Sequence, residues 1–225
     1  MLPPPDQERL SRHLRPCELP VGQVLYKPGG TIEHVYFPTI GVVSLLAELA
    51  SGQQVEVATV GDEGMVGLPI FLGAGPPTER AAVQISGAAL TMTAEQFRHD
   101  VAVLDGSLQG AMQRYTQATF TQLARNAACN RGHAIRQRCA RWLLMTADRM
   151  HSDFFELTQE FMAQMLGVRR ATVSEVAAAL AADGCIAYRR GTITITDRAR
   201  LRSQACECYE VVRDAFTRAY QSALP

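Results

Sequence analysis

The first part of the chain alternates short apolar runs with glycine, proline and polar turns. Four runs show the period of two that is typical of strands, at residues 21–30, 34–49, 53–60 and 81–93. The segments PGG, ASGQ and GAGPP between them favour tight turns. Many short strands joined by such turns predict a β-sandwich or a jelly-roll-like barrel.

The pattern changes at Thr93, which is placed to cap a helix with Glu95 in its first turn. No proline occurs from Leu104 to Arg149, which indicates a long helical passage. Apolar or small residues recur in it at positions 104, 108, 111, 115, 118 and 123. This stripe could pair with its copy as a dimer seam, or it could pack against the β domain of its own chain. Both readings stay open, because Gln122 and Arg125 fall near the later seam positions.

Residues 157–182, LTQEFMAQMLGVRRATVSEVAAALAA, carry the most specific pattern. Thr158 can cap a first amphipathic helix, and Gly167 ends that helix where a tight turn needs a positive φ. A second amphipathic helix follows, with Val173 and Leu180 on its inner face. Two short helices around a glycine turn predict a helix-turn-helix.

The outward side chains at the start of the second helix suit the major groove of DNA, since arginines bond guanine edges or phosphates and small hydroxyls allow close approach. These candidate DNA-binding residues are Arg169, Arg170, Thr172, Ser174 and Glu175. The following DGCIAYRRGTITITD indicates a hairpin wing, whose Arg189 and Arg190 would meet backbone phosphate. The alternative is an ordinary helical pair with a solvated charged face.

The net charge of zero conceals a strong asymmetry along the chain. Residues 1–124 hold 7 basic and 12 acidic side chains, a net charge of −5, whereas residues 125–202 hold 13 and 7, a net charge of +6. The last 23 residues have a net charge of −1. A basic segment on a neutral chain indicates one region that meets a polyanion.

The chain opens without a secretory signal, and its longest apolar run, residues 41–50, is too short to span a bilayer. We therefore expect a cytoplasmic protein without a membrane partner, whose six cysteines are thiols. Cys206 and Cys208 form a C-x-C pair that lacks the C-x-x-C spacing usual for zinc, so packed or solvent-facing thiols are the favoured reading and no metal is expected.

No nucleophile–base set, H-E-x-x-H or Walker loop is present, so we expect no enzyme. We do not expect a helix after the glycines of residues 61–75, so these glycines are no signature of a nucleotide hydrolase.

The whole pattern resembles the Crp/Fnr family of bacterial transcription regulators. The resemblance rests on the helix-turn-helix motif, on GDEGMVGLP in a β-rich context and on NRGHAIRQRCARWLL. It implies an α+β fold with an N-terminal β-roll sensor domain (1–103), a central dimerisation helix (104–130) and a C-terminal winged helix-turn-helix domain (131–225). It also implies a homodimer on a palindromic operator in double-stranded DNA, with RNA polymerase as a further partner.

Departures from the family bear on the ligand. In cyclic-nucleotide members, a glutamate follows a pocket glycine, a serine follows the phosphate arginine, and helix hydroxyls contact the base. The matching positions here are Gly67, Leu68, Arg80, Ala81, Leu123 and Ala124. Only the arginine keeps a charged contact, and Arg80 could instead pair with Glu79 or a nearby carboxylate. Losing several polar partners, each worth about 0.5–1.5 kcal/mol, predicts a degenerate pocket without a cyclic AMP response.

The family's base-contacting arginine, glutamate and arginine correspond here to Arg170, Ala171 and Glu175, so the operator sequence does not transfer. A lone Cys17 near the N-terminus excludes a four-cysteine iron–sulfur cluster, and no pair of histidines is selected as haem ligands. The sequence thus predicts a DNA-binding regulator with no cofactor and an unknown effector. The alternative is a ligand-responsive signalling module that acts through a protein partner.

Overall fold

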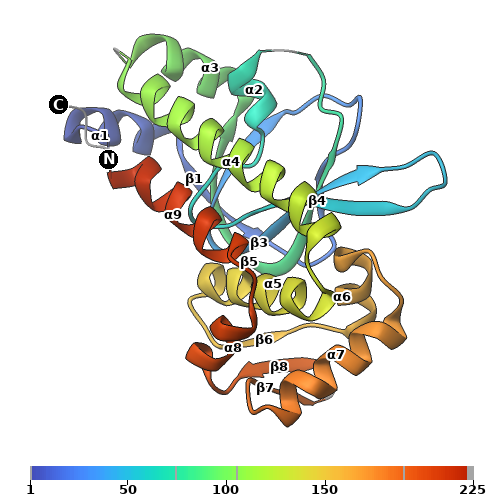
Figure 1. Cartoon of the computed structure of the whole chain (residues 1–225). Helices are drawn as coiled ribbons and strands as arrows, with labels where there is room; N and C mark the ends of the chain where they lie inside the picture. Colours follow the sequence, from blue (N-terminus) through green and yellow to red (C-terminus); the bar gives the residue numbers. More distant parts are fainter. Residues whose placement is uncertain (1, 74, 105, 190, 222–225) are drawn as a thin grey trace.

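The structure is a computed structural model that describes residues 2–73, 75–104, 106–189 and 191–221. A β-rich N-terminal part, a long helix and a smaller helical C-terminal part follow one another along the chain (Figure 1). This arrangement confirms the predicted α+β class with a β-roll, a long central helix and a winged helix-turn-helix. The division at residues 103 and 130 stays a prediction.

The β-roll is an antiparallel sheet with the strand order β1-β5-β3-β4, and β2 also pairs with β5. Val35 and Val42 belong to the main hydrophobic core and Val43 to a second apolar cluster, and each is 0% exposed, so both faces of β3 are covered. The strands are β1 (Arg15–Leu19), β2 (Val24–Tyr26), β3 (His34–Glu48), β4 (Gln54–Val60) and β5 (Arg80–Thr93).

Three helices accompany the β-roll. The sequence pattern did not predict α1 (Pro4–His13), which precedes the first strand. The expectation that the glycines of 61–75 lead into no helix is wrong, because α2 (Leu68–Leu72) directly follows Gly67. Gly67 and Gly73 take positive φ angles of 105° and 66° at its two ends, and five residues are too few to show a helical period. Helix α3 (Ala94–Val103) begins as expected, since the Thr93 side chain accepts from Gln96 N.

The helical passage from Leu104 to Arg149 is two helices, α4 (Ser107–Gly132) and α5 (Ile135–Met150), joined at His133 and Ala134. Most of the predicted stripe on α4 is buried within one chain, as Leu108, Tyr115 and Ala118 are at most 6% exposed. Gln122 is also buried, and its Nε2 donates to Thr59 Oγ1 in β4 at 3.2 Å. This stripe therefore packs against its own chain and leaves any dimer seam to another face of α4.

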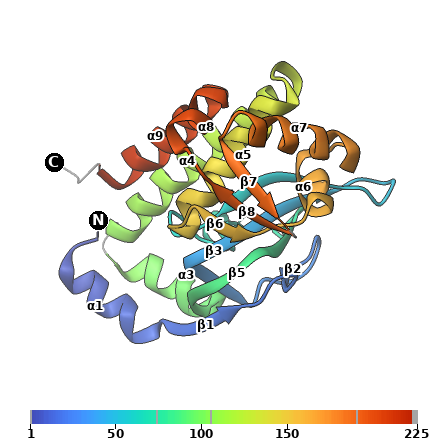
Figure 2. The ribbon, with the colours of Figure 1, turned by 90° about the horizontal axis from the view of Figure 1, so that it is seen from below.

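The C-terminal part consists of two short helices, a three-stranded sheet in the order β6-β8-β7 and two further helices. The last helix runs back alongside α4, as both ribbon views show (Figures 1 and 2). The elements are β6 (Phe154–Glu156), α6 (Gln159–Leu166), α7 (Arg170–Ala182), β7 (Ile186–Arg189), β8 (Thr192–Ile195), α8 (Arg198–Gln204) and α9 (Cys208–Gln221). Within the described ranges, none of the helices combines the length and apolarity needed to cross a membrane.

Helix α5 docks the C-terminal part onto the β-roll. Trp142 Nε1 donates to Glu56 Oε1 at 2.8 Å, and Arg149 Nη2 lies 2.6 Å from Glu63 Oε1. The apolar residues around these pairs belong to one hydrophobic core that spans both parts. Because buried polar groups must find partners, these contacts fix how the two parts meet.

Candidate nucleic-acid interface and sensor pocket

The helix-turn-helix has the local geometry that its sequence predicts. The Thr158 side chain accepts from Phe161 N at 3.2 Å and caps α6. Gly167 ends α6 with a φ of 65°, a conformation that favours glycine. Met162, Val173 and Leu180 are each 0% exposed and join α6 and α7 to the core. The remaining face of α7 is therefore turned outward.

The candidate residues on that face come together at the N-terminal end of α7. Arg169 is its N-cap and Arg170 its first residue, and Arg169, Arg170, Ser174 and Glu175 are exposed while Thr172 is half-buried. Among the described residues, neither arginine makes an ion pair. The helix dipole adds positive potential at this end, so the arrangement is suited to an anion such as a phosphate.

The wing lies beside this helix pair. Strand β7 ends at Arg189, which is exposed, and β8 begins at Thr192. Leu157 N donates to Gly191 O at 2.6 Å, which joins the tip of the hairpin to the segment that enters α6. Arg190, the second candidate at this tip, lies outside the described residues.

The tentative sensor pocket is lined differently from a phosphate cradle. Gly67 is buried at the start of α2, where a Cβ would lie 3.1 Å from Val35 Cγ1. Leu68 is half-buried, and Ala81 is 0% exposed between its strand partners Tyr26 and Leu45. Neither Leu68 nor Ala81 has a side-chain group that can bond a sugar hydroxyl or a phosphate.

Arg80 pairs with a carboxylate of its own chain. Its Nη2 lies 3.7 Å from Glu48 Oε2 on the neighbouring strand, with side chains 28% and 42% exposed. Glu79, the partner named first from the sequence, instead accepts from the Tyr26 hydroxyl at 2.9 Å. Arg80 Nε is buried and has no hydrogen-bond partner in the described part of the chain. The Nε–H group of Arg80 is therefore a buried donor without an acceptor among the described residues.

The other tentative ligand residues, Leu123 and Ala124, are exposed on α4. A cavity of about 350 Å³ adjoins the glycine-rich segment, and neither these two residues nor Gly67, Leu68, Arg80 and Ala81 line it. Its lining includes Ile32, Pro69, Ile70, Pro77 and Arg98. This cavity therefore does not gather the residues that the family resemblance selected.

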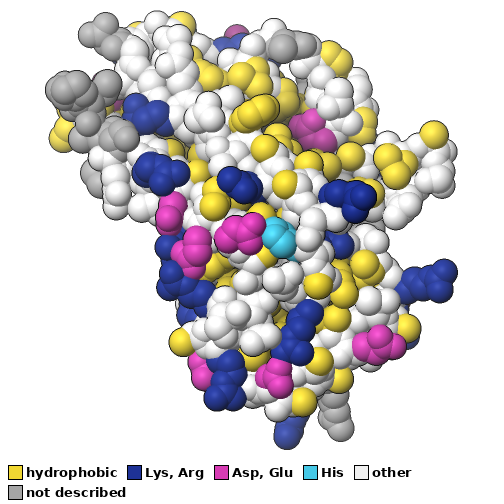
Figure 3. All heavy atoms as spheres, in the orientation of Figure 1, with side chains coloured by type: hydrophobic (Ala, Val, Ile, Leu, Met, Phe, Trp, Pro, Cys, Tyr) yellow, Lys and Arg dark blue, Asp and Glu magenta, His cyan; other side chains and the backbone are white. Residues whose placement is uncertain are grey.

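A second stripe on α4, absent from the sequence-based prediction, stays exposed on the isolated chain. It consists of six residues with alternating spacings of four and three, Gln113, Gln117, Phe120, Ala124, Ala127 and Arg131. We call it the α4 stripe. Phe120 is 65% exposed, and hydrophobic side chains gather on the surface over α4 (Figure 3). The spacing is that of a two-helix seam, and small or polar residues obscured it in the sequence.

A β-roll joined through a long helix to a winged helix-turn-helix defines a DNA-binding transcription regulator with a sensor-type domain. Residues 16–100 match the model of the cyclic nucleotide-binding domain, and residues 137–204 match the model of the Crp-like helix-turn-helix domain. The chain belongs to the Crp/Fnr family of transcription regulators.

The relatives of this chain include regulators whose effectors differ. A CRP-like cAMP-activated global transcriptional regulator of Mycobacterium tuberculosis is 25% identical over 206 residues, which cover 87% of this chain and 90% of the relative. FixK2 from Bradyrhizobium japonicum has a TM-score of 0.71 and 18% identity, covering 86% of this chain and 98% of its own. The c-di-GMP responsive regulator CLP of Xanthomonas campestris has a TM-score of 0.68 and 16% identity, covering 86% and 99%. The two structural neighbours support the fold alone.

Proposed function

We propose that this regulator binds a palindromic operator as a homodimer, with one α7 helix in the major groove of each half-site. The observation that carries this proposal is the N-terminal end of α7, where Arg169 and Arg170 are exposed and free of ion pairs within the described chain. A recognition helix reads bases with its first residues, and two-fold protein symmetry matches a two-fold operator. Half-sites would then lie about 34–36 Å, or one helical turn, apart.

The contacts divide by chemistry. We assign Arg170, Thr172, Ser174 and Glu175 to the base edges, because Arg170, Ser174 and Glu175 are exposed on α7 and the half-buried Thr172 lies at the edge of the same face. Arg169 at the N-cap and Arg189 at the end of β7 are assigned to backbone phosphates, together with Arg190, which lies outside the described residues. Phosphate contacts position the helix, and the base contacts supply the sequence preference.

The α4 stripe is the proposed dimer seam. Phe120, Ala124 and Ala127 are exposed on the isolated chain, and pairing with a second copy would remove them from water. Burying one phenylalanine side chain contributes about 1.5–3 kcal/mol. Phe120→Asp should therefore shift the purified protein toward the monomer in sedimentation equilibrium, whereas Val21→Asp, at an apolar position that is also 65% exposed but lies outside the stripe, should leave the dimer intact.

We propose that cyclic AMP is not the effector. Leu68 and Ala81 offer no polar side chain where cyclic-nucleotide members of the family have an acid and a hydroxyl, and Arg80 pairs with Glu48. Leu123 and Ala124 likewise lack hydroxyls for a base. Losing three or more polar contacts would lower affinity by orders of magnitude.

The second candidate is a small anionic effector other than cyclic AMP. The buried Nε of Arg80, which lacks a hydrogen-bond partner in the described chain, favours it. An anion could accept from this donor and compete with Glu48, because that pair is long at 3.7 Å. Such a ligand would make the β-roll the sensor of the regulator.

The remaining assignments follow from this role. We place the protein in the cytoplasm, where bacterial operators and RNA polymerase are accessible to it, and we assign it no catalytic step. One experiment tests the core of the proposal: selection of binding sites from random DNA duplexes by the purified protein, with and without cyclic AMP. We expect a palindrome that is enriched equally in both arms. Enrichment only with cyclic AMP would overturn the effector assignment, and enrichment of no sequence would overturn the proposed operator binding.

A further inference from the structure

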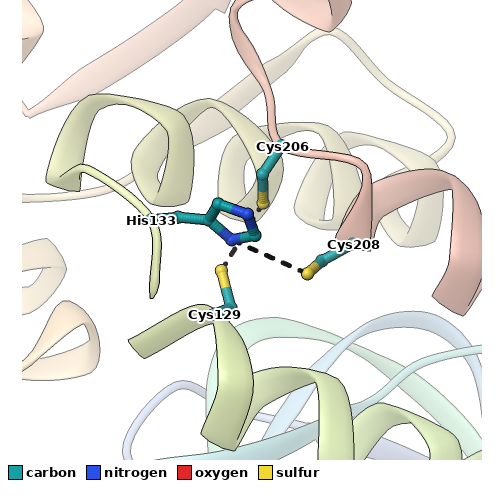
Figure 4. Close-up of side chains that lie close together, drawn as sticks. All are labelled: Cys129, His133, Cys206 and Cys208. Carbon is teal, nitrogen blue, oxygen red and sulfur yellow. Dashed lines mark hydrogen bonds between the residues drawn. The ribbon is translucent and has the colours of Figure 1, made fainter. Parts of the chain in front are cut away.

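Four side chains with metal-binding atoms meet where α4 ends and α9 begins. They are Cys129 on α4, His133 at the α4–α5 junction, Cys206 in the α8–α9 connection and Cys208 at the first residue of α9 (Figure 4). One nitrogen or sulfur atom of each lies within 4.8 Å of the others, and the three cysteines are at most 3% exposed. Two segments that are far apart in the sequence, residues 129–133 and 206–208, thus converge on one point.

The spacing of these atoms suits a tetrahedral ion. Cys129 Sγ lies 3.5 Å from Cys206 Sγ, and Cys208 Sγ lies 3.8 Å from His133 Nδ1. A tetrahedral zinc ion bonds sulfur at about 2.3 Å and nitrogen at about 2.0–2.1 Å, which places its ligand atoms roughly 3.5–3.8 Å apart. These two distances fall in this range, and all four ligand atoms lie within 4.8 Å of one another, so small side-chain shifts would complete a tetrahedral shell.

The histidine is oriented for ligation through Nδ1. Its other ring nitrogen, Nε2, lies 3.2 Å from Glu207 Oε1, while Nδ1 faces the sulfur of Cys208. A carboxylate that accepts a hydrogen bond from Nε2–H keeps the proton on Nε2 and leaves Nδ1 as the unprotonated nitrogen that a metal needs. Glu207 stands between Cys206 and Cys208 in the sequence, so one short segment supplies two ligands and the residue that orients a third.

A buried cation beside the cluster matches the charge of an occupied site. Zinc with three thiolates and a neutral imidazole has a net charge of −1. Arg141 is 5% exposed, acts electrostatically on all three cysteines, and has an Nε without a hydrogen-bond partner in the described chain. Its Nη1 donates to Asn126 Oδ1 at 2.7 Å, which fixes it one turn of α4 from Cys129. This guanidinium would offset the negative charge of the site.

We propose that Cys129, His133, Cys206 and Cys208 form a structural zinc site. All four positions are filled by protein ligands, which leaves none for a substrate and distinguishes the site from a catalytic one. The ion would tie the end of α4 and the α4–α5 junction to the start of α9. Helix α9 also contacts α4 further along, where Arg114 Nε donates to Ala219 O at 3.0 Å. Zinc would therefore hold the connection between the β-roll and the DNA-binding part.

Metal content of the full-length protein, purified under reducing conditions without chelators, tests this site. We expect one zinc ion per chain in the wild type, and its loss in the double variant Cys206→Ser/Cys208→Ser. Cys17→Ser, a half-buried cysteine of β1 outside the cluster, is the matched control and should retain the zinc. Cobalt(II) added to the metal-free wild type should give the tetrahedral and thiolate-to-metal absorption bands of an S₃N site.

A gentler variant separates ligation from folding. Glu207→Gln changes a side chain that is 65% exposed and should weaken zinc binding by about 10–100-fold in competition with a chromophoric chelator. Glu95→Gln, at an exposed position on α3, should leave the affinity unchanged. A wild-type protein that binds neither zinc nor cobalt after full reduction would overturn the proposal. A disulfide between Cys129 and Cys206 in a protein that takes up no metal after reduction would overturn it as well. These measurements involve no DNA, so they stand apart from the proposed operator binding.

Discussion

Arginines in two regions of the molecule have opposite settings. Arg149, where α5 meets the β-roll, is 5% exposed, and its Nε and Nη2 lie 2.8 and 2.6 Å from Glu63 Oε1. Arg170, at the start of α7, is exposed and makes no ion pair in the described chain. A buried arginine that is paired with a carboxylate of its own chain cannot bind another anion. An exposed arginine without an ion pair remains available to a phosphate or a base. The same residue type is therefore structural at the junction and available for recognition on α7.

The largest effect is expected at the junction. Arg149→Met leaves Glu63 without its cation, and breaking a buried pair costs about 3–5 kcal/mol. Urea denaturation should show this loss in the free energy of unfolding. Arg213→Met is the matched control, because Arg213 is 40% exposed and its pairs with Glu210 and Asp214 contribute at most about 1 kcal/mol. Equal losses in both variants would mean that burial does not distinguish the two settings.

Glu56 tests the junction through pH. Burial raises the pKa of Glu56 from 4.5 to about 7, although the bonds from Ser44 and Trp142 oppose the shift. Between pH 4.5 and about 7, Glu56 is protonated in the folded protein but ionised in the unfolded chain. The stability that the protonated Glu56 contributes is therefore complete below pH 4.5 and is lost as the pH rises through about 7. Glu56→Gln should remove this dependence and add up to about 3 kcal/mol above pH 7. Thermal unfolding from pH 5 to 8 measures it, and an unchanged profile would contradict the role of Glu56.

Arg170 should affect DNA binding instead of stability. Arg170→Ala is expected to cost about 1–3 kcal/mol in affinity for the selected operator and to relax sequence preference at one base pair per half-site. Arg189→Ala should weaken all sequences alike and reduce the salt slope by about one, as expected of a phosphate contact. Fluorescence anisotropy at several salt concentrations separates the two. If both variants lose affinity equally for all sequences, Arg170 contacts the phosphate backbone and not a base.

The smallest effect is expected at Arg80. Its pair with Glu48 is partly exposed and 3.7 Å long, so Arg80→Ala should change the free energy of unfolding by less than about 1 kcal/mol. Cyclic AMP should leave the melting temperature of both the wild type and Arg80→Ala unchanged. A nucleotide-dependent rise in the wild type that disappears in the variant would restore Arg80 as a cyclic-phosphate ligand.

Features that depend on neighbouring residues could be predicted from the sequence. The cap at Thr158, the turn at Gly167 and the hairpin after Asp183 appear in the structure as the sequence indicates, because each is decided within a few residues. Helix α2 was missed because five residues show no period, and the break at His133 was missed although Gly132 ends α4 directly before it.

Features that depend on distant residues could not be predicted. The apolar stripe through Leu108 and Tyr115 resembles a dimer seam, yet it is buried under the β-roll and α9. The face that stays exposed, with Phe120 and Ala124, contains too few large apolar residues to stand out. A helical period shows that a face will be covered, but only the packing of the chain decides what covers it.

The sequence by itself determined the local elements, the charge asymmetry and the family, because capping, periodicity and composition act over short distances. Tertiary structure decided which charges are paired and which ligand atoms meet. Cys129 and Cys206 are 77 positions apart, and their sulfur atoms lie 3.5 Å apart only because α9 returns along α4. Spacing along the chain therefore gave no sign of the four-residue cluster, since burial of the apolar face of α9, not local sequence, brings those side chains together.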